Sequence, residues 1–183
     1  MAARLRPLRL EAFGTHRSPS RLLPATSIFS ALGDIPSDTV GLQATWLAAP
    51  RLAVLGSVAA RWAGDDLGAD AWVRTTLRLD EGGEGTMSIE ARRFGVPPDE
   101  WTGLRLRGRF PLVYGIALGT EVEIARPDDP DGRGALWPWG LVSLGGEILE
   151  HWEAAVGVEA LASPQKTHQI AGLARLSYQW GAP

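Results

Sequence analysis

Apolar and polar residues alternate along most of the chain with a period of two residues. Between Ile116 and Ile124 the even-numbered positions hold Ile, Leu, Thr, Val and Ile, and the odd-numbered positions hold Ala, Gly, Glu and Glu. Successive side chains of a β-strand point to opposite faces of a sheet, so this alternation indicates strands with one apolar and one polar face. The 3.6-residue spacing of an amphipathic helix is almost absent. The pattern therefore predicts an all-β protein.

The alternation predicts ten strands of 10 to 13 residues each. Strands of soluble proteins are typically about 5–6 residues long, whereas a tilted strand needs about 9–11 residues to cross a bilayer. These lengths favour one domain, residues 1–183, folded as an antiparallel up-and-down transmembrane β-barrel of about ten strands, or as an open C-terminal portion of a larger barrel. The expected strands are 4–16, 39–48, 51–63, 70–80, 86–95, 101–110, 114–125, 135–146, 152–162 and 168–180.

The connections between the expected strands alternate between short and long. Transmembrane barrels have short turns on the periplasmic side and longer loops outside. We therefore expect both chain termini on the periplasmic side. The short turns are expected at 49–50, 80–85, 111–113 and 147–151, and the longest polar connections are 18–38 and 126–134.

Two connections have features of their own. Residues 24–33, in the long outer loop, predict a short helix, because Pro24 stands near its start and Gly33 at its end. Such a segment would either fold inward as a plug or pack on the barrel rim, which is the commoner arrangement. The acidic run 126–134 lacks the spacing of a calcium-binding loop, and its Pro and Asp residues are ordinary turn formers, so we expect a solvated loop.

The two faces of the expected strands differ in chemistry. Aliphatic residues fill one register of 51–63 and of 114–125, which suits contact with lipid, and small or charged residues fill the other, which suits a lumen. Aromatic residues gather near the strand ends, where amphipathic rings anchor between hydrocarbon and headgroups. Trp62 and one or both of Trp137 and Trp139 are expected at the outer ends. The expected aromatic girdle is Trp46, Trp62, Phe110, Tyr114, Trp137, Trp139, Trp152, Tyr178 and Trp180.

Composition narrows the functional classes. The formal net charge of −3 indicates neither a basic surface that binds nucleic acid nor a polybasic segment that binds a membrane surface. The absence of cysteine excludes disulfides, thiolate metal sites and cysteine nucleophiles. No stretch approaches the roughly 18 consecutive apolar residues of a transmembrane helix. The first residues also lack the apolar run of a secretory signal peptide.

Long alternating strands, unequal connections and aromatic strand ends together resemble the bacterial outer-membrane β-barrel proteins. In that family the barrel-assembly machinery recognises a C-terminal strand with alternating apolar residues and a terminal aromatic. Ile170, Leu176, Tyr178 and Trp180 stand at the corresponding positions. The resemblance implies location in the outer membrane, with outer-membrane lipid and the assembly machinery as partners.

The resemblance also implies export, which a chain without a signal peptide does not explain. Either the true start lies upstream, or the chain is the C-terminal part of a longer barrel, and we favour the second. Strand 168–180 is expected to pair with 4–16 in a complete barrel, and to lie apart from it in an open portion. Arg175 stands where the assembly signal often has glycine, and 181–183 follow the aromatic, so both depart from the family pattern.

A set of charged residues shares the polar register of neighbouring strands. The set would either line a pore and bias which ions pass, or form ion pairs inside a packed lumen, and we favour pairing. A turn at 111–113 would place Arg105 opposite Gly119 and Glu121 on the diagonal, within reach of a long side chain. The expected lumen charge network is Arg74, Arg78, Glu90, Arg92, Arg105, Arg107, Arg109, Glu121 and Glu123.

No catalytic, metal or cofactor site is expected. Closure would bring His16 and His168 to one rim with acidic residues such as Asp65, Asp66 and Asp99, but no nucleophile motif accompanies them. Two distant histidines also fall short of metal-ligand spacing. We expect an integral outer-membrane β-barrel with a structural or passive-pore role. The alternative is a soluble, lipocalin-like barrel that binds a small apolar ligand inside.

Overall fold

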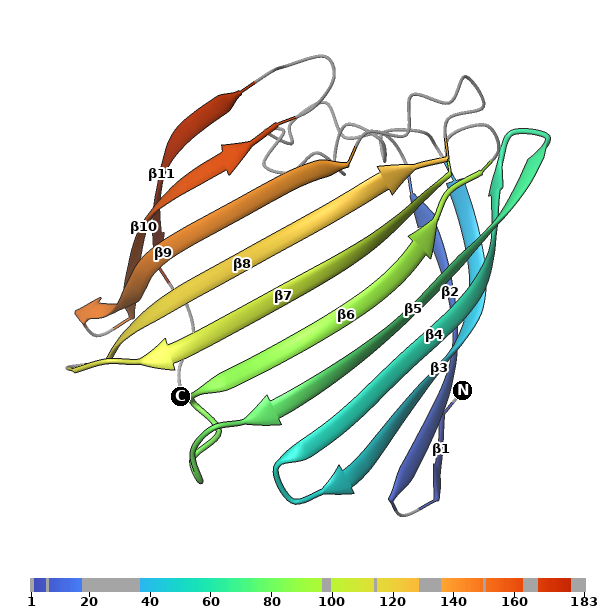
Figure 1. Cartoon of the computed structure of the whole chain (residues 1–183). Coiled ribbons are helices and arrows are strands. Elements are labelled where there is room, and N and C mark those ends of the chain that lie inside the picture. Colours follow the sequence, from blue (N-terminus) through green and yellow to red (C-terminus); the bar gives the residue numbers. More distant parts are fainter. Residues whose placement is uncertain are drawn as a thin grey trace.

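The chain forms a single antiparallel β-sheet in a computed structural model. The structure describes residues 2–5, 7–17, 37–96, 100–113, 115–128, 136–149, 151–162 and 168–178. Each strand pairs antiparallel with the next along the chain, so the all-β, up-and-down architecture predicted from the alternation is confirmed (Figure 1). The described residues contain no helix long and apolar enough to cross a membrane.

The sheet has eleven strands, one more than predicted. Most are 9 to 13 residues long, and β1 is the exception with 4. The strands are β1 (Ala2–Leu5), β2 (Leu8–Arg17), β3 (Ser37–Ala49), β4 (Leu52–Ala63), β5 (Asp66–Arg78), β6 (Thr86–Phe94), β7 (Trp101–Pro111), β8 (Ile116–Pro127), β9 (Trp137–Leu149), β10 (Trp152–Leu161) and β11 (Gln169–Tyr178).

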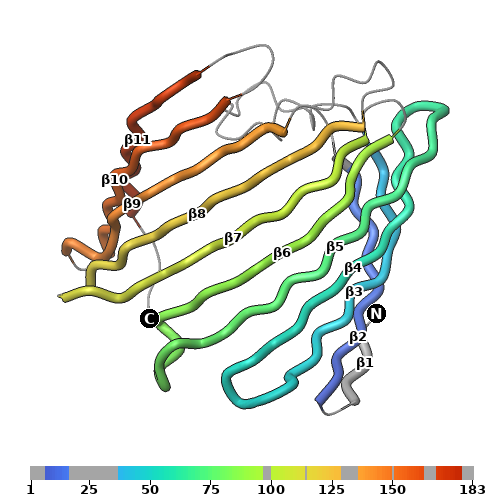
Figure 2. The backbone as a smooth tube through the Cα atoms, in the orientation of Figure 1, coloured from blue at the N-terminus to red at the C-terminus, as the bar shows by residue number. Residues whose placement is uncertain are grey.

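The sheet curves into an open trough and does not close. β1 and β11 are its edges, and they pair only with β2 and β10 within the described strands. The two edges lie on opposite sides of the trough, with β11 at the left and β1 at the right in Figure 1, and Figure 2 shows the curved backbone from β2 to β11 between them. Of the two arrangements considered for strand 168–180, the structure therefore has the open one. Since all pairings are antiparallel and both edge strands are odd-numbered, β1 and β11 run in the same direction.

The first expected strand, 4–16, is wrong as a single element. It divides into β1 and β2, and Leu5 pairs directly with Leu8 across the turn. Pro7 has no backbone N–H for a continuing ladder and favours a turn, which explains the break. The alternation carries a signal of this break, because Leu5 is odd-numbered whereas Leu8 and Leu10 are even-numbered.

Two connections also differ from expectation. β5 begins at Asp66 rather than near residue 70, so β4 and β5 are joined by the tight turn Gly64–Asp65, in which Gly64 has a φ of 62°. In the β7–β8 hairpin, Arg105 lies opposite Glu123, and Arg109 rather than Arg105 lies opposite Gly119. The turn centres beyond the expected 111–113, because the backbone N–H of Leu112 donates to the Ile116 carbonyl at 2.8 Å.

The strand pairing divides the side chains of the sheet into two faces. We call the first the apolar face; it holds the register of Leu42, Val58, Val73, Ile89, Leu106, Val122, Val142, Val156 and Leu176. We call the second the polar face; it holds the register of Gln43, Ser57, Arg74, Glu90, Arg105, Glu123, Ser143, Glu159 and Arg175.

Glycine contacts show that the polar face is the concave one. A Cβ placed on Gly41 would lie 2.5 Å from the Ala59 Cβ, and one on Gly145 would lie 2.7 Å from the Ala155 Cβ. Facing Cβ atoms of an antiparallel pair are normally about 4.5–5.5 Å apart, so side chains converge on this face. On the apolar face, a Cβ on Gly56 or on Gly140 would meet nothing nearer than 3.7 Å, and the closer contacts of Gly108 are with the side chains of Phe110 and Thr120.

Burial is inverted relative to a water-soluble protein. The buried polar side chains include Asp70, Glu90, Glu123 and Glu159, all on the polar face. The exposed large hydrophobic side chains lie mainly on the apolar face, such as Leu42 at 62% and Leu176 at 62% exposure. Soluble domains bury apolar side chains and leave charged ones in water. This sheet therefore places its charges in the trough and its apolar side chains outside.

Several expectations fall outside the described residues. They are the helix at 24–33 within the loop 18–38, most of the acidic connection 126–134, and the residues Asp99, Tyr114 and Trp180.

Candidate functional site

Arginine and glutamate side chains meet on the concave face of β5–β8. Each of these strands contributes to the group because cross-strand neighbours in this register alternate in charge: Glu90 lies between Arg74 and Arg105, and Glu123 lies opposite Arg105. We call the group the Arg–Glu cluster, defined as Arg74, Glu90, Arg92, Arg105, Arg107, Glu121 and Glu123.

Glu123 is the centre of the Arg–Glu cluster and has a relative exposure of 0%. Arg105 donates from Nε at 2.9 Å and from Nη2 at 2.6 Å to its Oε2. Arg92 forms an ion pair with the other carboxylate oxygen, Oε1. A buried carboxylate is tolerated only when charged and hydrogen-bonding partners compensate for its lost hydration. The two arginines supply that compensation.

The other two glutamates extend the network along both sides. Glu90 accepts a hydrogen bond from Arg74 Nε at 2.6 Å and lies 3.5 Å from Arg92 Nη1. Glu121 Oε1 lies 3.0 Å from Arg105 Nε and 3.2 Å from Arg107 Nε. Arg105 and Glu121 are therefore in direct contact despite the incorrect register expected for this hairpin.

Aromatic rings cover two of the arginines, which the sequence interpretation did not include. The Arg92 guanidinium lies 5.0 Å from the Trp101 ring centroid and 5.9 Å from that of Phe94. Arg74 lies 5.3 Å from the Trp72 ring centroid. Guanidinium groups are attracted to aromatic faces at such distances. The sequence pattern could have indicated these contacts, because Trp72 lies in the same register as Arg74, and Trp101 in the same register as Arg105.

Two members of the expected lumen network stand apart from the Arg–Glu cluster. Arg78 and Arg109 lie on the polar face near the ends of β5 and β7, and no ion pair joins them to another described residue. Conversely, sequence reasoning missed a pair farther along the same face. Arg61 Nε donates to Asp70 Oδ2 at 2.7 Å, and Asp70 Oδ1 accepts from the backbone N–H of Gly95 at 3.3 Å.

The aromatic residues predicted for the girdle divide between the faces. Trp46, Trp62, Phe110, Trp152 and Tyr178 lie on the apolar face. Trp152 and Tyr178 pair across β10 and β11 with their ring centroids 5.0 Å apart. Tyr114 and Trp180 are not among the described residues.

Trp137 and Trp139 lie at the strand end expected for them, the start of β9, but not on the face of the other described girdle residues. Both lie on the polar face, because Trp139 pairs opposite Glu123 and Trp137 opposite Ala125. Trp139 is buried, with 6% exposure. Their odd-numbered positions share the register of Ser143 and not that of Val142, so strand-end position alone was misleading.

The structure does not bring the candidate rim residues together. His16 lies on β2 and contacts Asp38, with Nδ1 2.7 Å from Oδ1, whereas His168 precedes β11 at the other edge of the sheet. Asp65 and Asp66 lie at the β4–β5 turn. Among the residues that the structure describes, no three His, Cys, Asp or Glu side chains are grouped for metal binding.

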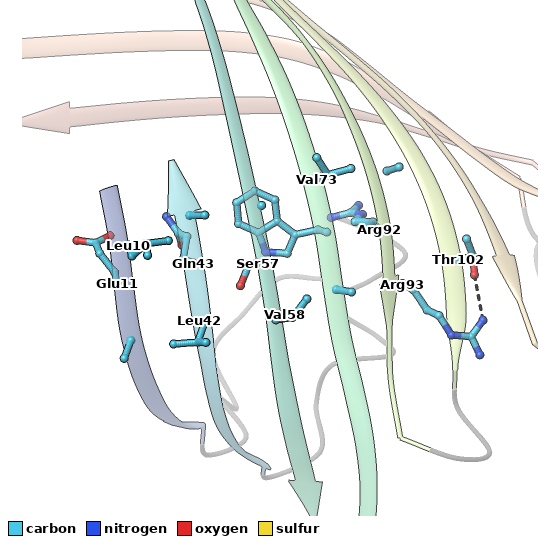
Figure 3. A pocket seen from close by; sticks show the side chains of 16 residues that line it. Leu10, Glu11, Leu42, Gln43, Ser57, Val58, Val73, Arg92, Arg93 and Thr102 are labelled. Atoms are coloured by element: carbon cyan, nitrogen blue, oxygen red, sulfur yellow. Dashed lines mark hydrogen bonds between the residues drawn. The ribbon is translucent and has the colours of Figure 1, made fainter. Parts of the chain in front are cut away.

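A shallow apolar groove of about 830 Å³ crosses the apolar face from β2 to β7 (Figure 3). Its small residues include Ala12, Ala44 and Gly56, with Leu42 and Val58 beside them. Near its β7 end, Arg93 donates to Thr102 Oγ1 at 3.4 Å. Most of the groove's lining side chains are small or aliphatic, so the groove can hold a hydrocarbon chain.

Comparison of the chain with known protein families, with curated proteins and with solved structures finds no match. What the protein does must therefore be inferred from its own residues and their arrangement.

Proposed function

We propose that the chain is an integral outer-membrane β-barrel protein whose apolar face contacts lipid and whose polar face lines the barrel interior. Its role is structural, or that of a passive pore, and involves no catalysis. One observation carries the proposal: the exposed convex face of a long-stranded sheet is uncharged over most of its height.

On β2–β11 the ionisable side chains of the apolar face are confined to one end of the sheet. They are His16, Asp38, Arg93 and Arg126. This end, which we call the long-loop end, holds the β2–β3, β6–β7 and β8–β9 connections. The rest of the face is aliphatic, small or aromatic, with threonine at 75, 102 and 120. A transmembrane barrel presents such an apolar band, about 25 Å tall, to lipid.

Aromatic placement supports the same orientation. Trp46, Phe110, Trp152 and Tyr178 lie on the apolar face near the opposite end, which we call the short-turn end, and Trp62 lies near the long-loop end. Amphipathic rings at both ends of an apolar band favour the two membrane interfaces. The short-turn end is then the periplasmic side.

A soluble barrel with an apolar ligand inside requires the opposite curvature. Its aliphatic side chains would line the concave face, and its charged side chains would face water. Here Glu123 and Glu90 are buried in the trough, and Val122 and Ile89 are exposed on the convex face. The arrangement of faces therefore favours the membrane proposal over the lipocalin-like alternative.

A membrane location also requires that the two edge strands of the sheet have hydrogen-bonding partners. Backbone N–H and C=O groups left unpaired in hydrocarbon cost several kcal/mol each. In the membrane we therefore expect further strands to pair with β1 and β11. Because β1 and β11 run in the same direction, closure with only antiparallel pairs needs an odd number of added strands.

Vesicle flotation tests the proposal. The chain is refolded from urea into lipid vesicles and centrifuged through a density gradient. We expect it to float with the vesicles, to remain there after a carbonate wash, and to sediment as aggregate when detergent and lipid are both absent. A chain that stays monomeric and folded in the lipid-free supernatant would contradict the proposal.

A further inference from the structure

A second, polar cavity lies on the concave face and shares Arg74, Arg107 and Glu121 with the Arg–Glu cluster. Its volume is about 350 Å³. It lies towards the short-turn end of the sheet, because Arg109 stands two residues before Pro111, where β7 ends. The lining combines guanidinium groups with hydroxyls, and its principal members are Arg74, Arg107, Arg109, Ser88, Thr86 and Ser143.

The charges around this cavity do not balance. Glu121 is the one carboxylate in its described lining, and Glu121 Oε1 is already shared by Arg105 Nε at 3.0 Å and Arg107 Nε at 3.2 Å. Arg74 is paired with Glu90. Arg109 lines the cavity and forms no ion pair with any other described residue. The lining thus retains a positive charge that its own carboxylates leave uncompensated.

The donors in the cavity also lack enough acceptors. Arg107 Nε is buried and makes no well-aligned hydrogen bond, although it lies 3.2 Å from Glu121. Hydroxyls of Thr86, Ser88 and Ser143 face the same space. Guanidinium and hydroxyl donors around a compact space are the groups that recognise phosphate-like oxyanions.

We propose that this cavity binds a small, multiply charged oxyanion of the phosphate class, with Arg109 as the principal cationic contact. The cavity lies on the concave face, away from the apolar face, so the ligand is a dissolved oxyanion and not a lipid headgroup. An oxyanion site is a property beyond the proposed barrel. It rests on the barrel proposal in one respect, because the ligand reaches the cavity only if water fills the trough.

Isothermal titration with inorganic phosphate tests the site on the full chain folded in a phosphate-free detergent. Arg109→Gln removes the unpaired cation. Arg9→Gln is the matched control, because Arg9 also lies on the polar face of the sheet, on β2 and outside the cavity, and forms an ion pair with Glu11. We expect saturable binding by the unsubstituted protein and by Arg9→Gln, and at least about tenfold weaker binding by Arg109→Gln, as for loss of a hydrogen bond to a charged group.

Two further measurements keep the test decisive. Sodium chloride at matched ionic strength should give no saturable heat, and Ser143→Ala should weaken phosphate binding without changing the circular dichroism spectrum. Equal binding by Arg109→Gln and the unsubstituted protein, or equal heats with chloride and phosphate, would overturn the site. A chain that floats with vesicles yet binds no phosphate would refute this inference and leave the barrel proposal standing.

Discussion

Arg105 and Glu123 face each other on β7 and β8, and the guanidinium donates two hydrogen bonds, of 2.9 and 2.6 Å, to one oxygen of a fully buried carboxylate. The pair lies on the concave face of a sheet whose convex face is apolar. In a water-soluble domain such a pair would more often be found at the surface. Its position in the trough, on the face opposite the exposed apolar side chains, supports the proposed membrane location.

A double-mutant cycle on Arg105 and Glu123 should reveal strong coupling. Glu123→Gln leaves Arg105 and Arg92 without their shared carboxylate, and Arg105→Met leaves Glu123 with one partner fewer. We expect the loss in the double variant to be smaller than the sum of the single losses, by about 0.5–3 kcal/mol. Urea-induced unfolding from vesicles, followed by tryptophan fluorescence, measures each free energy. Additive losses would indicate independently solvated charges and an open interior.

Adjacent substitutions on β3 should separate the two faces. Leu42 lies on the apolar face with 62% exposure, and Gln43 lies on the polar face. Leu42→Arg should lower the free energy of folding into vesicles by about 2–4 kcal/mol, because a charge on the lipid face near midplane is that unfavourable. Gln43→Arg should have a much smaller effect, since Glu11 lies opposite position 43. Equal effects of the two arginines would contradict the assignment of faces.

Glycine substitutions should report the curvature of the sheet. A Cβ at Gly145 would lie 2.7 Å from the Ala155 Cβ, whereas at Gly56 the nearest atom is 3.7 Å away. Gly145→Val should therefore destabilise the fold by about 1–3 kcal/mol, as overpacking does. Gly56→Val should be tolerated, because valine suits a strand. The same unfolding assay measures both. A tolerated valine at 145 would mean that side chains do not converge on the polar face.

The connection between β5 and β6 should show a pH dependence. The backbone N–H of Gly85 donates to the Asp80 carboxylate and lowers the pKa of Asp80 below its usual 3.8. A carboxyl whose pKa is lowered by folding stabilises the fold above its ordinary pKa, and this contribution is lost as the pH falls through the lowered pKa. The stability difference between the unsubstituted protein and Asp80→Asn should thus shrink between about pH 5 and pH 2. A difference that is constant with pH would show that Asp80 has no such role.

Period-two alternation predicted most of the strands because each face of this sheet has its own chemistry. Leu52 to Trp62 on β4 and Ile116 to Ile124 on β8 keep the register that was expected for them. Alternation records the face of each residue and carries no information on turn geometry. The tight turn at Gly64 was missed for that reason. The break at Pro7 was missed although the change from odd to even positions between Leu5 and Leu8 indicates it.

The sequence predicted which residues belong to the Arg–Glu cluster better than it predicted which of them pair with one another. Residues of one parity on neighbouring strands must share a face, which grouped the glutamates with the arginines. The partner of Arg105 depended on the length of a turn, and a shift in register replaced Gly119 by Glu123. The pair of Arg61 and Asp70 was missed because β5 was expected to begin only at residue 70.

Oxygen and nickel-chelate accessibility of nitroxide labels along β3 tests the central claim most directly. The chain contains no cysteine, so single cysteines at Leu42, Gln43, Ala44 and Thr45 can be labelled without background. In vesicles, labels at Leu42 and Ala44 should be accessible to oxygen and protected from the chelate, as expected for side chains in lipid. Labels at Gln43 and Thr45 should show the reverse. Chelate access at all four positions, or the opposite alternation, would contradict a lipid-facing apolar surface.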